Sequence, residues 1–128
     1  MKVELQNLTK IFPSRNKKSG EEVIAVNDFT FTIPDGKLVG LLGPSGCGKT
    51  TTLRMIAGFE MPTEGQILLN GEDISYLPPY KRPVNTVFQK YALFPHLNVF
   101  ENIAFSLRVQ KKPNDEVVKS VKEMLELV

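Results

Sequence analysis

Alternating apolar and polar residues mark the start of the chain. Residues 3–8 alternate in this way, as expected of a strand with one buried face. Residues 23–33 are rich in β-branched and aromatic side chains, which predicts one strand, or two with a turn near Asn27 and Asp28. The Pro-Asp-Gly sequence of residues 34–36 is a turn signal. We therefore predict that the chain begins with an antiparallel β layer.

A mostly apolar run then leads into a helical pattern. Residues 37–42 are short and apolar enough to indicate a strand covered on both faces in a parallel sheet. Apolar side chains recur at helical spacing over residues 51–57, at Leu53, Ile56 and Ala57. Gly58 follows where a helix C-cap belongs. A buried strand, a glycine-rich turn and a helix are thus predicted in succession.

Two more strands and two helices are predicted after residue 58. Residues 66–69 form a strand pattern that ends at the tight-turn signal Asn70-Gly71, and residues 84–88 form another short strand. Asn98 and Glu101 have the spacing of a capping box, so a helix is expected to begin there. Its apolar face would consist of Val99, Phe100, Ile103, Ala104 and Leu107. The last helix begins at residues 113–116 and presents Val117, Val118, Val121, Met124, Leu125 and Val128.

The composition narrows the class of protein. The 128 residues suffice for one hydrophobic core and are few for two ordinary domains. A net charge of +2 is too small to indicate nucleic-acid binding. Neither a bilayer-spanning run nor an apolar signal sequence is present in the pattern, and the single Cys47 cannot form an internal disulfide. A cytoplasmic setting is the simplest expectation.

The strongest motif lies between the predicted buried strand and helix. Residues 43–50 fit the pattern G-x-x-x-x-G-K-[ST] of a phosphate-binding loop at every position. We predict that this loop and the next residue bind nucleotide, through Gly43, Pro44, Ser45, Gly46, Cys47, Gly48, Lys49, Thr50 and Thr51. The alternative is a glycine-rich turn with a surface lysine, which the flanking strand and helix patterns disfavour.

These residue types suit a triphosphate. The glycines let the backbone turn tightly, so that successive N–H groups and the positive end of a helix face the anion. Lys49 supplies a full positive charge for the terminal phosphates, and Thr50 offers a hydroxyl to Mg²⁺. Cys47 sits at a helix N-terminus, where a thiol pKa can fall, but it is favoured as a small residue that fits the loop.

Beyond the loop, longer stretches resemble a known family. The phosphate loop, Gly58, residues 65–67 and Val87-Phe88-Gln89 resemble the nucleotide-binding domain of ABC transporters. Residues 81–89, 91–96 and 98–102 resemble importer ATPases of the spermidine/putrescine type. The resemblance covers essentially the whole chain, and the polyamine subgroup is its looser part, since sugar and iron importers share much of the pattern. It implies an α/β P-loop NTPase, with an antiparallel β layer, an incomplete parallel core sheet and helices.

The resemblance also implies roles for individual residues. Phe12 matches the aromatic residue that stacks on adenine; the alternative is an apolar residue that closes the β layer. Gln89 matches the glutamine that reaches Mg²⁺, together with Thr50, and the terminal phosphate. The stretch from Tyr91 to Phe105 corresponds to the surface that receives the permease membrane subunits, or else is ordinary core. His96 is expected to position this loop rather than to act in catalysis.

Other family motifs are not found in these residues. The signature sequence, the Walker B strand and the switch histidine have no counterpart, and residues 67–73 are rejected as Walker B because Asn70-Gly71 turns the chain there. Residues 1–128 therefore resemble the N-terminal part of one nucleotide-binding domain. The family implies ATP and Mg²⁺, a second nucleotide-binding subunit and a cytoplasmic position on the inner face of the membrane. The alternatives are a non-catalytic nucleotide-binding or permease-docking remnant and a soluble ATPase of the family.

Overall fold

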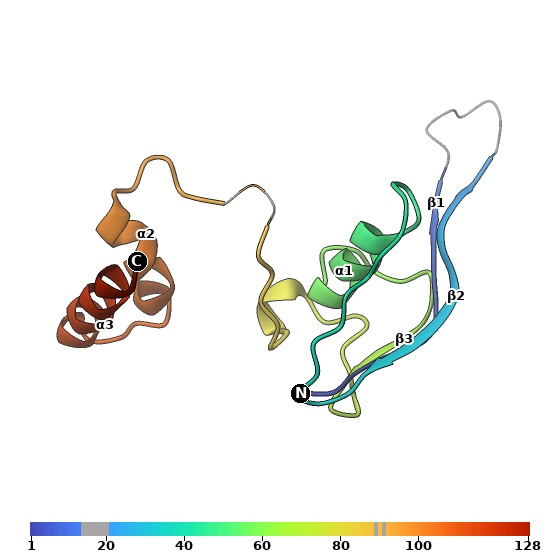
Figure 1. Cartoon of the computed structure of the whole chain (residues 1–128), viewed down its shortest axis with the longest axis horizontal. Helices are drawn as coiled ribbons and strands as arrows, with labels where there is room; N and C mark the ends of the chain where they lie inside the picture. Colours follow the sequence, from blue (N-terminus) through green and yellow to red (C-terminus); the bar gives the residue numbers. More distant parts are fainter. Residues whose placement is uncertain (14–20, 89, 91) are drawn as a thin grey trace. The chain divides into compact units, whose positions relative to one another are not determined.

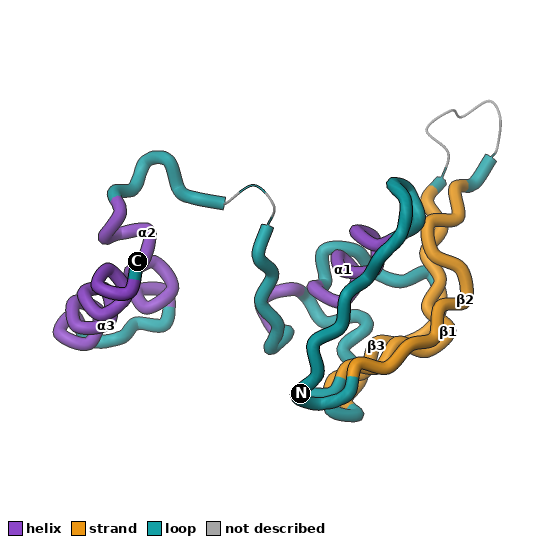
Figure 2. The backbone as a smooth tube through the Cα atoms, viewed as in Figure 1, coloured by secondary structure: helices purple, strands orange, loops and turns teal. Residues whose placement is uncertain are grey.

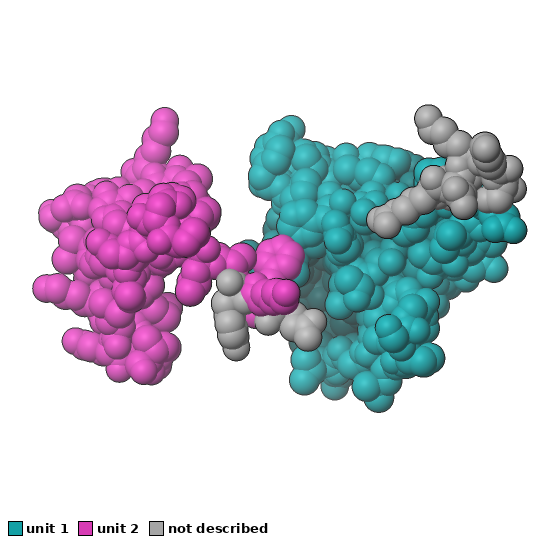
Figure 3. Space-filling view, turned by 90° about the horizontal axis from the view of Figure 1, so that it is seen from above, with its two compact units in different colours: residues 1–86 teal, residues 87–128 magenta. Residues whose placement is uncertain are grey.

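The computed structural model describes residues 1–13, 21–88, 90 and 92–128. Gln89 and Tyr91 lie outside the described residues. The chain divides into two compact units, Met1–Thr86 and Val87–Val128, which Figure 3 colours separately. Within the described ranges, no helix combines the length and apolar character needed to cross a membrane.

The first unit is built on an antiparallel sheet (Figures 1 and 2). Its strands are β1 (Val3–Phe12), β2 (Val23–Ile33), β3 (Glu64–Leu69) and β4 (Glu72–Asp73), in the order β2-β1-β3-β4. Asn70 and Gly71 have φ angles of 51° and 85°, which the tight turn between β3 and β4 requires. The predicted β layer and this hairpin are confirmed, and so is the rejection of residues 67–73 as a Walker B strand.

The predicted turn near Asp28 is an irregularity within one strand. Asn7 and Asp28 both have positive φ angles, of 49° and 47°. Asn7 Nδ2 donates a hydrogen bond to Asp28 Oδ1 at 2.8 Å, and the Asp28 amide donates to Thr9 Oγ1 at 3.0 Å. The pairing of β1 with β2 shifts between Leu8 and Lys10 as a result. Side-chain oxygens satisfy the backbone there, so β2 continues as one strand.

Helix α1 (Lys49–Ala57) covers one face of this sheet and shares its core. Gly58 ends the helix at a φ of 82°, with its amide donating to Met55 O at 3.2 Å, so the predicted C-cap is confirmed. Met55 is fully buried, whereas Leu53, which was expected on the apolar face, is 53% exposed. The core consists of Val3, Leu5, Leu8, Val26, Met55, Ile67, Leu69 and Ile74.

Two predicted strands do not form among the described residues. Residues 37–42 and 84–88 have no regular secondary structure and pair with no described strand. Leu38 and Leu42 are 101% and 97% exposed. A buried parallel strand needs a neighbour along its edge and cover on both faces, and the described residues provide neither for these segments. The fold is α/β with an antiparallel sheet, and these two strands are a correction to the predicted pattern.

A buried arginine joins α1 to the segment after β4. Arg82 follows the short 3₁₀ helix η1 (Pro79–Lys81) and is 5% exposed. Its guanidinium donates to four carbonyl oxygens, at Met55 (2.6 Å), Ile56 (3.0 Å), Leu77 (2.8 Å) and Ser75 (2.9 Å). Burial lowers the pKa of Arg82 from its usual value, and the nearby Asp73 opposes this shift. The sequence pattern around Arg82 does not indicate this burial, because its partners lie on distant segments.

The second unit contains α2 (Val99–Val109) and α3 (Asn114–Leu127). The two helices pack through Ala104, Val117 and Val121, with Phe100, Ile103 and Leu107 around them. Asn98 caps α2 as predicted, because its Oδ1 accepts from the Glu101 amide at 2.8 Å. The Glu101 carboxylate binds Arg108 at 2.8 Å instead of accepting from the Asn98 amide. The prediction of a complete capping box is therefore wrong.

Candidate functional site

The phosphate-loop sequence forms the entrance to α1. Gly46 and Gly48 have φ angles of 84° and 89°, in the left-handed region that favours glycine. A Cβ on Gly48 would lie 2.5 Å from the carbonyl oxygen of Ala25 in β2. Only glycine therefore lets the loop pass this close to β2 and place Lys49 at the first position of the helix.

Lys49 extends its ammonium group along the loop that precedes it. Nζ donates to the carbonyl oxygens of Gly43 and Pro44 at 2.5 and 2.8 Å, and lies 3.3 Å from Cys47 Sγ. These contacts hold a full positive charge against the loop backbone. Phosphate oxygens are stronger acceptors than carbonyl oxygens because they carry charge, so this ammonium is placed to bind them.

The first turn of α1 adds partial positive charge beside Lys49. Amide groups in the first turn of a helix have no carbonyl partner four residues earlier, so they remain available to anions. Thr50 and Thr51 belong to this turn, and it contains no acidic residue that would offset its charge. The loop and the helix start thus favour a multiply charged anion.

Two hollows flank the loop. One, of about 260 Å³, is lined by Ala25, Ser45, Gly46, Gly48, Lys49, Thr50 and Thr51. The other, of about 320 Å³, is lined by Ala25, Val26, Asn27, Phe29, Leu41, Leu42, Cys47, Gly48, Lys49 and Thr52. Lys49 and Gly48 line both hollows, which places the predicted phosphate ligands between them.

The residues of the loop can help to hold Mg²⁺ only when phosphate supplies further ligands. Over the described ranges, no group of three or more His, Cys, Asp or Glu side chains is placed to hold a metal ion. Mg²⁺ often takes one or two protein oxygens and completes its shell with phosphates and water. Thr50 lines the smaller hollow, and its hydroxyl can be such a ligand.

Phe12 lies at the far end of β1, opposite Val23 of β2. It lines neither of the two hollows beside the loop. Its ring centroid lies 4.9 Å from the ammonium of Lys10, a residue that the sequence did not single out. The structure thus brings Gly43 to Thr51 together at one site, and leaves Phe12 at the edge of the same unit.

The second unit has an apolar groove of about 330 Å³. It is lined by Leu93, Phe94, Pro95, Leu97, Val99, Asn102 and Ile103. Leu93 is 71% exposed, and Phe94 lies against Phe105 with the ring centroids 4.3 Å apart. His96 meets the Phe94 ring edge-on at 6.0 Å. The groove falls within the stretch predicted to dock on membrane subunits, and the part of that prediction at Tyr91 lies outside the described residues.

Asn102 holds the backbone around this groove. Its Nδ2 donates to the carbonyl oxygens of Phe94 (3.2 Å), Leu97 (3.0 Å) and Asn98 (2.9 Å), and its Oδ1 accepts from the Phe94 amide at 2.9 Å. An asparagine in the first turns of a helix is usually a neutral surface residue, so composition does not reveal this role. The contacts fix residues 94–98 as one rim of the groove.

Comparison with known proteins places the chain among transport proteins. The family model described as ABC transporter matches residues 26–128. The Spermidine/putrescine import ATP-binding protein PotA of Haemophilus ducreyi is 54% identical over 126 residues, which cover 98% of this chain and 32% of the relative. The protein of the same name from Mannheimia succiniciproducens is 57% identical over 112 residues, 88% of this chain and 30% of the relative. The chain spans about a third of the length of these relatives.

Solved structures agree with this placement. The dimeric structure of MJ0796, a bacterial ABC transporter cassette, aligns with a TM-score of 0.78 and 28% identity, over 97% of this chain and 54% of that chain. The dimeric post-hydrolysis state of MJ0796 bound to ADP and Pi aligns with a TM-score of 0.74 and 26% identity, over 97% and 56% of the two chains.

Proposed function

We propose, since this chain belongs to the ABC transporter family, that it is the ATP-binding portion of an importer ATPase that takes up a small solute. We propose further that the solute is a polyamine, spermidine or putrescine, which is what the names of its relatives state for those proteins. The observation that carries the proposal is the Lys49 ammonium, held 2.5 Å from Gly43 O at the start of α1.

Each site residue has a defined part in this function. The loop amides and Lys49 bind the phosphates of ATP, and the Thr50 hydroxyl holds Mg²⁺ together with Gln89. Phe12 stacks on adenine, because its aromatic face suits a purine. When bound, Mg²⁺ would neutralise charge on the terminal phosphates. The roles of Gln89 and Phe12 are supported by the family resemblance. Phe12 also ends β1, which belongs to the same unit as the loop.

The partners follow from the same family. Permease membrane subunits dock near Tyr91 to Phe105, the stretch that contains the apolar groove, and a second nucleotide-binding subunit pairs with this one. The exposed Leu93 and the fixed rim of the groove support docking. The pairing of two subunits is supported by the solved structures that match this chain, which are dimeric. The chain is then cytoplasmic and peripheral on the inner face of the membrane.

Replacing Lys49 tests the nucleotide site. Lys49→Ala removes a charge-assisted contact worth about 1.5–3 kcal/mol, so the Kd of a fluorescent ATP analogue should rise by roughly 10- to 150-fold. Lys37→Ala is the matched control, because Lys37 is an exposed lysine that lines neither hollow beside the loop. Titration of the analogue into all three proteins measures the change. Equal affinities for Lys49→Ala and the wild type would refute the proposal.

A further inference from the structure

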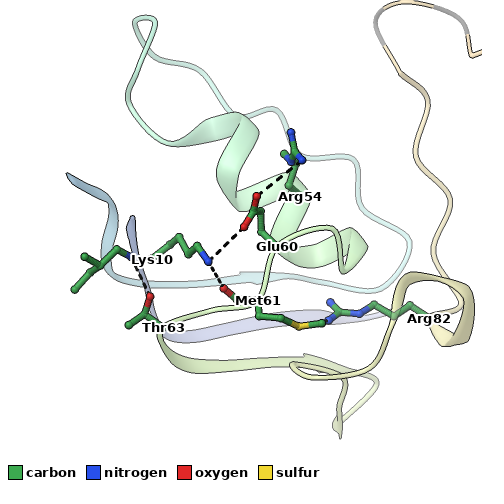
Figure 4. Close-up of polar contacts among 7 residues, drawn as sticks. Lys10, Arg54, Glu60, Met61, Thr63 and Arg82 are labelled. Atoms are coloured by element: carbon green, nitrogen blue, oxygen red, sulfur yellow. Dashed lines mark hydrogen bonds and ion pairs between the residues drawn. The ribbon is translucent and has the colours of Figure 1, made fainter. Parts of the chain in front are cut away.

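The end of β1 is fastened to the segment that follows α1. The Ile11 amide donates to Thr63 Oγ1 at 3.0 Å (Figure 4). The Thr63 amide donates to Thr9 O at 2.8 Å. Phe12 is the next residue of β1. Its backbone is therefore tied, through these bonds, to residues that lie just beyond the C-cap Gly58.

Lys10 occupies the centre of this junction. Its Nζ donates to Met61 O at 2.8 Å and forms an ion pair with Glu60 Oε2 at 3.3 Å (Figure 4). The Lys10 side chain is only 15% exposed, and the Glu60 side chain is 27% exposed. Arg54 of α1 approaches the other oxygen of Glu60 at 3.9 Å. An ammonium with two acceptors and little solvent access has a well-defined position.

The same ammonium contacts the Phe12 ring. The distance from Lys10 Nζ to the ring centroid is 4.9 Å, within the range of a cation–π interaction. Lys10 and Phe12 are two residues apart on β1, so their side chains leave the strand on the same face. A cation on one face of an aromatic ring leaves the opposite face for a neutral aromatic partner.

The anchor of Lys10 also has a fixed relation to the phosphate loop. Glu60 and Met61 follow α1, and the loop precedes α1. This helix has nine residues, so it is a rod about 13 Å long between the loop and the anchor. Any group held by Glu60 and Met61 therefore keeps a set distance from Lys49.

We propose that Lys10 is a positioning residue for the nucleotide base. It orients the Phe12 ring and ties it to the segment after α1, so that the stacking surface and the phosphate loop suit one ligand, a purine nucleoside triphosphate. Lys10 acts through Phe12 and does not touch the phosphates. This inference rests on the proposed function, in which Phe12 stacks on adenine.

The test compares two ligands on variants of the whole 128-residue chain. Lys10→Met keeps the length and apolar stem of the side chain but removes its charge. Calorimetric titration should show the Kd for Mg-ATP rising about two- to tenfold, while the Kd for Mg-bound inorganic triphosphate stays unchanged. Lys10→Arg should recover most of the ATP affinity, since guanidinium also pairs with carboxylate and stacks on aromatic rings. Lys2→Met, which loses an ion pair with Glu4 elsewhere on the sheet, is the matched control.

Two further variants show whether Lys10 works through Phe12. Phe12→Ala should weaken ATP binding and spare triphosphate, and adding Lys10→Met to it should have no further effect. Glu60→Gln keeps Lys10 but weakens the ion pair that anchors it. It should therefore raise the Kd for ATP by less than Lys10→Met does, and it should also leave the Kd for triphosphate unchanged. Circular dichroism shows whether Lys10→Met folds. If that variant does not fold, Glu60→Gln tests the role of Lys10 in its place.

The possible failures are distinct. The inference is overturned if Phe12→Ala discriminates between the ligands while Lys10→Met and Glu60→Gln affect both equally or neither. It is also overturned if the double variant binds ATP more weakly than Phe12→Ala, because Lys10 would then act by another route. If Phe12→Ala itself does not discriminate, the stacking role of Phe12 fails, and this inference fails with it; the phosphate-loop assignment, tested by Lys49→Ala, stands.

Discussion

Gly48 shows how strongly one position can determine the site. Its φ is 89°, and a Cβ at this position would lie 2.5 Å from Ala25 O, so there is no room for a side chain. The residue stands directly before Lys49, so any shift that relieves a clash there also moves the ammonium. The loop can therefore keep its geometry beside the backbone of β2 only because residue 48 has no Cβ.

Gly48→Ala should therefore impair both folding and binding. Gly71→Ala is the matched control, since Gly71 has a φ of 85° and no atom within 4 Å of a built Cβ. Both variants bear the strain of a left-handed alanine, of about 1–2 kcal/mol. Gly48→Ala alone adds a clash, so its free energy of unfolding should fall by a further 1–3 kcal/mol, roughly the cost of overpacking, and its Kd for ATP should rise. Urea titrations and nucleotide binding measure the two effects, and equal losses would contradict this account.

Residues with local signals could be predicted from sequence, and those with distant partners could not. The phosphate loop and the cap at Asn98 depend on neighbours within a few positions, so their patterns are visible in the chain. Lys10 meets Met61, 51 residues away, and Arg82 meets Met55, 27 residues away. No pattern in the sequence records such pairings, because they arise when the sheet and α1 pack.

At the scale of elements, Arg82 links α1 to the segment after β4 in the first unit. It binds carbonyls from the C-terminal turn of α1 and from the segment after β4 at once. Gly58 completes this junction, because a Cβ there would lie 2.6 Å from Arg82 Nε. The helix that carries the phosphate loop is thus held at its other end by one side chain.

Arg82→Lys should destabilise the protein although it keeps the charge. A single ammonium cannot reach four carbonyl oxygens, and each buried acceptor that loses its donor costs about 1–3 kcal/mol. We expect the free energy of unfolding to fall by at least about 2 kcal/mol. Arg54→Lys is the control, since the Arg54 side chain is 56% exposed and its ion pair is 3.9 Å long. Similar denaturation midpoints for the two variants would show that the Arg82 contacts contribute little.

Elements were predictable where turns and caps define them. The hairpin at Asn70-Gly71, the end of α1 at Gly58 and the start of α2 at Asn98 all follow from local chemistry. Residues 37–42 and 84–88 have the composition of strands, yet they pair with no described strand. A strand exists only with a partner, so composition alone overestimates sheet wherever the neighbours are not among the described residues.

For the whole molecule, binding and hydrolysis are expected to separate. Hydrolysis needs a carboxylate to orient or deprotonate the attacking water and an Asp that holds Mg²⁺ together with Thr50, and neither hollow beside the loop is lined by Asp or Glu. Losing one positioned electrostatic group commonly costs about 10²–10³ in rate. The 128-residue polypeptide should therefore bind Mg-ATP and release phosphate no faster than background.

A phosphate-release assay on the purified chain checks this expectation. Lys49→Ala is assayed beside it, because a contaminating ATPase would be unaffected by that substitution. Turnover that disappears in Lys49→Ala would belong to this chain. It would show that residues other than the expected carboxylates perform the chemistry.

The placement of Arg82 also has a consequence for how fast a ligand arrives. The C-terminal carbonyls of α1 carry about half a negative charge, and the N-terminal amides about half a positive one. Arg82 binds the negative end, and Arg54 lies in the same last turn, while no acid occupies the first turn. Arg82 thus offsets the negative end of the helix, and the positive end, together with the Lys49 ammonium, is left to act on anions at the loop. We therefore expect polyanions to be attracted toward the loop, with an association rate that declines as ionic strength rises.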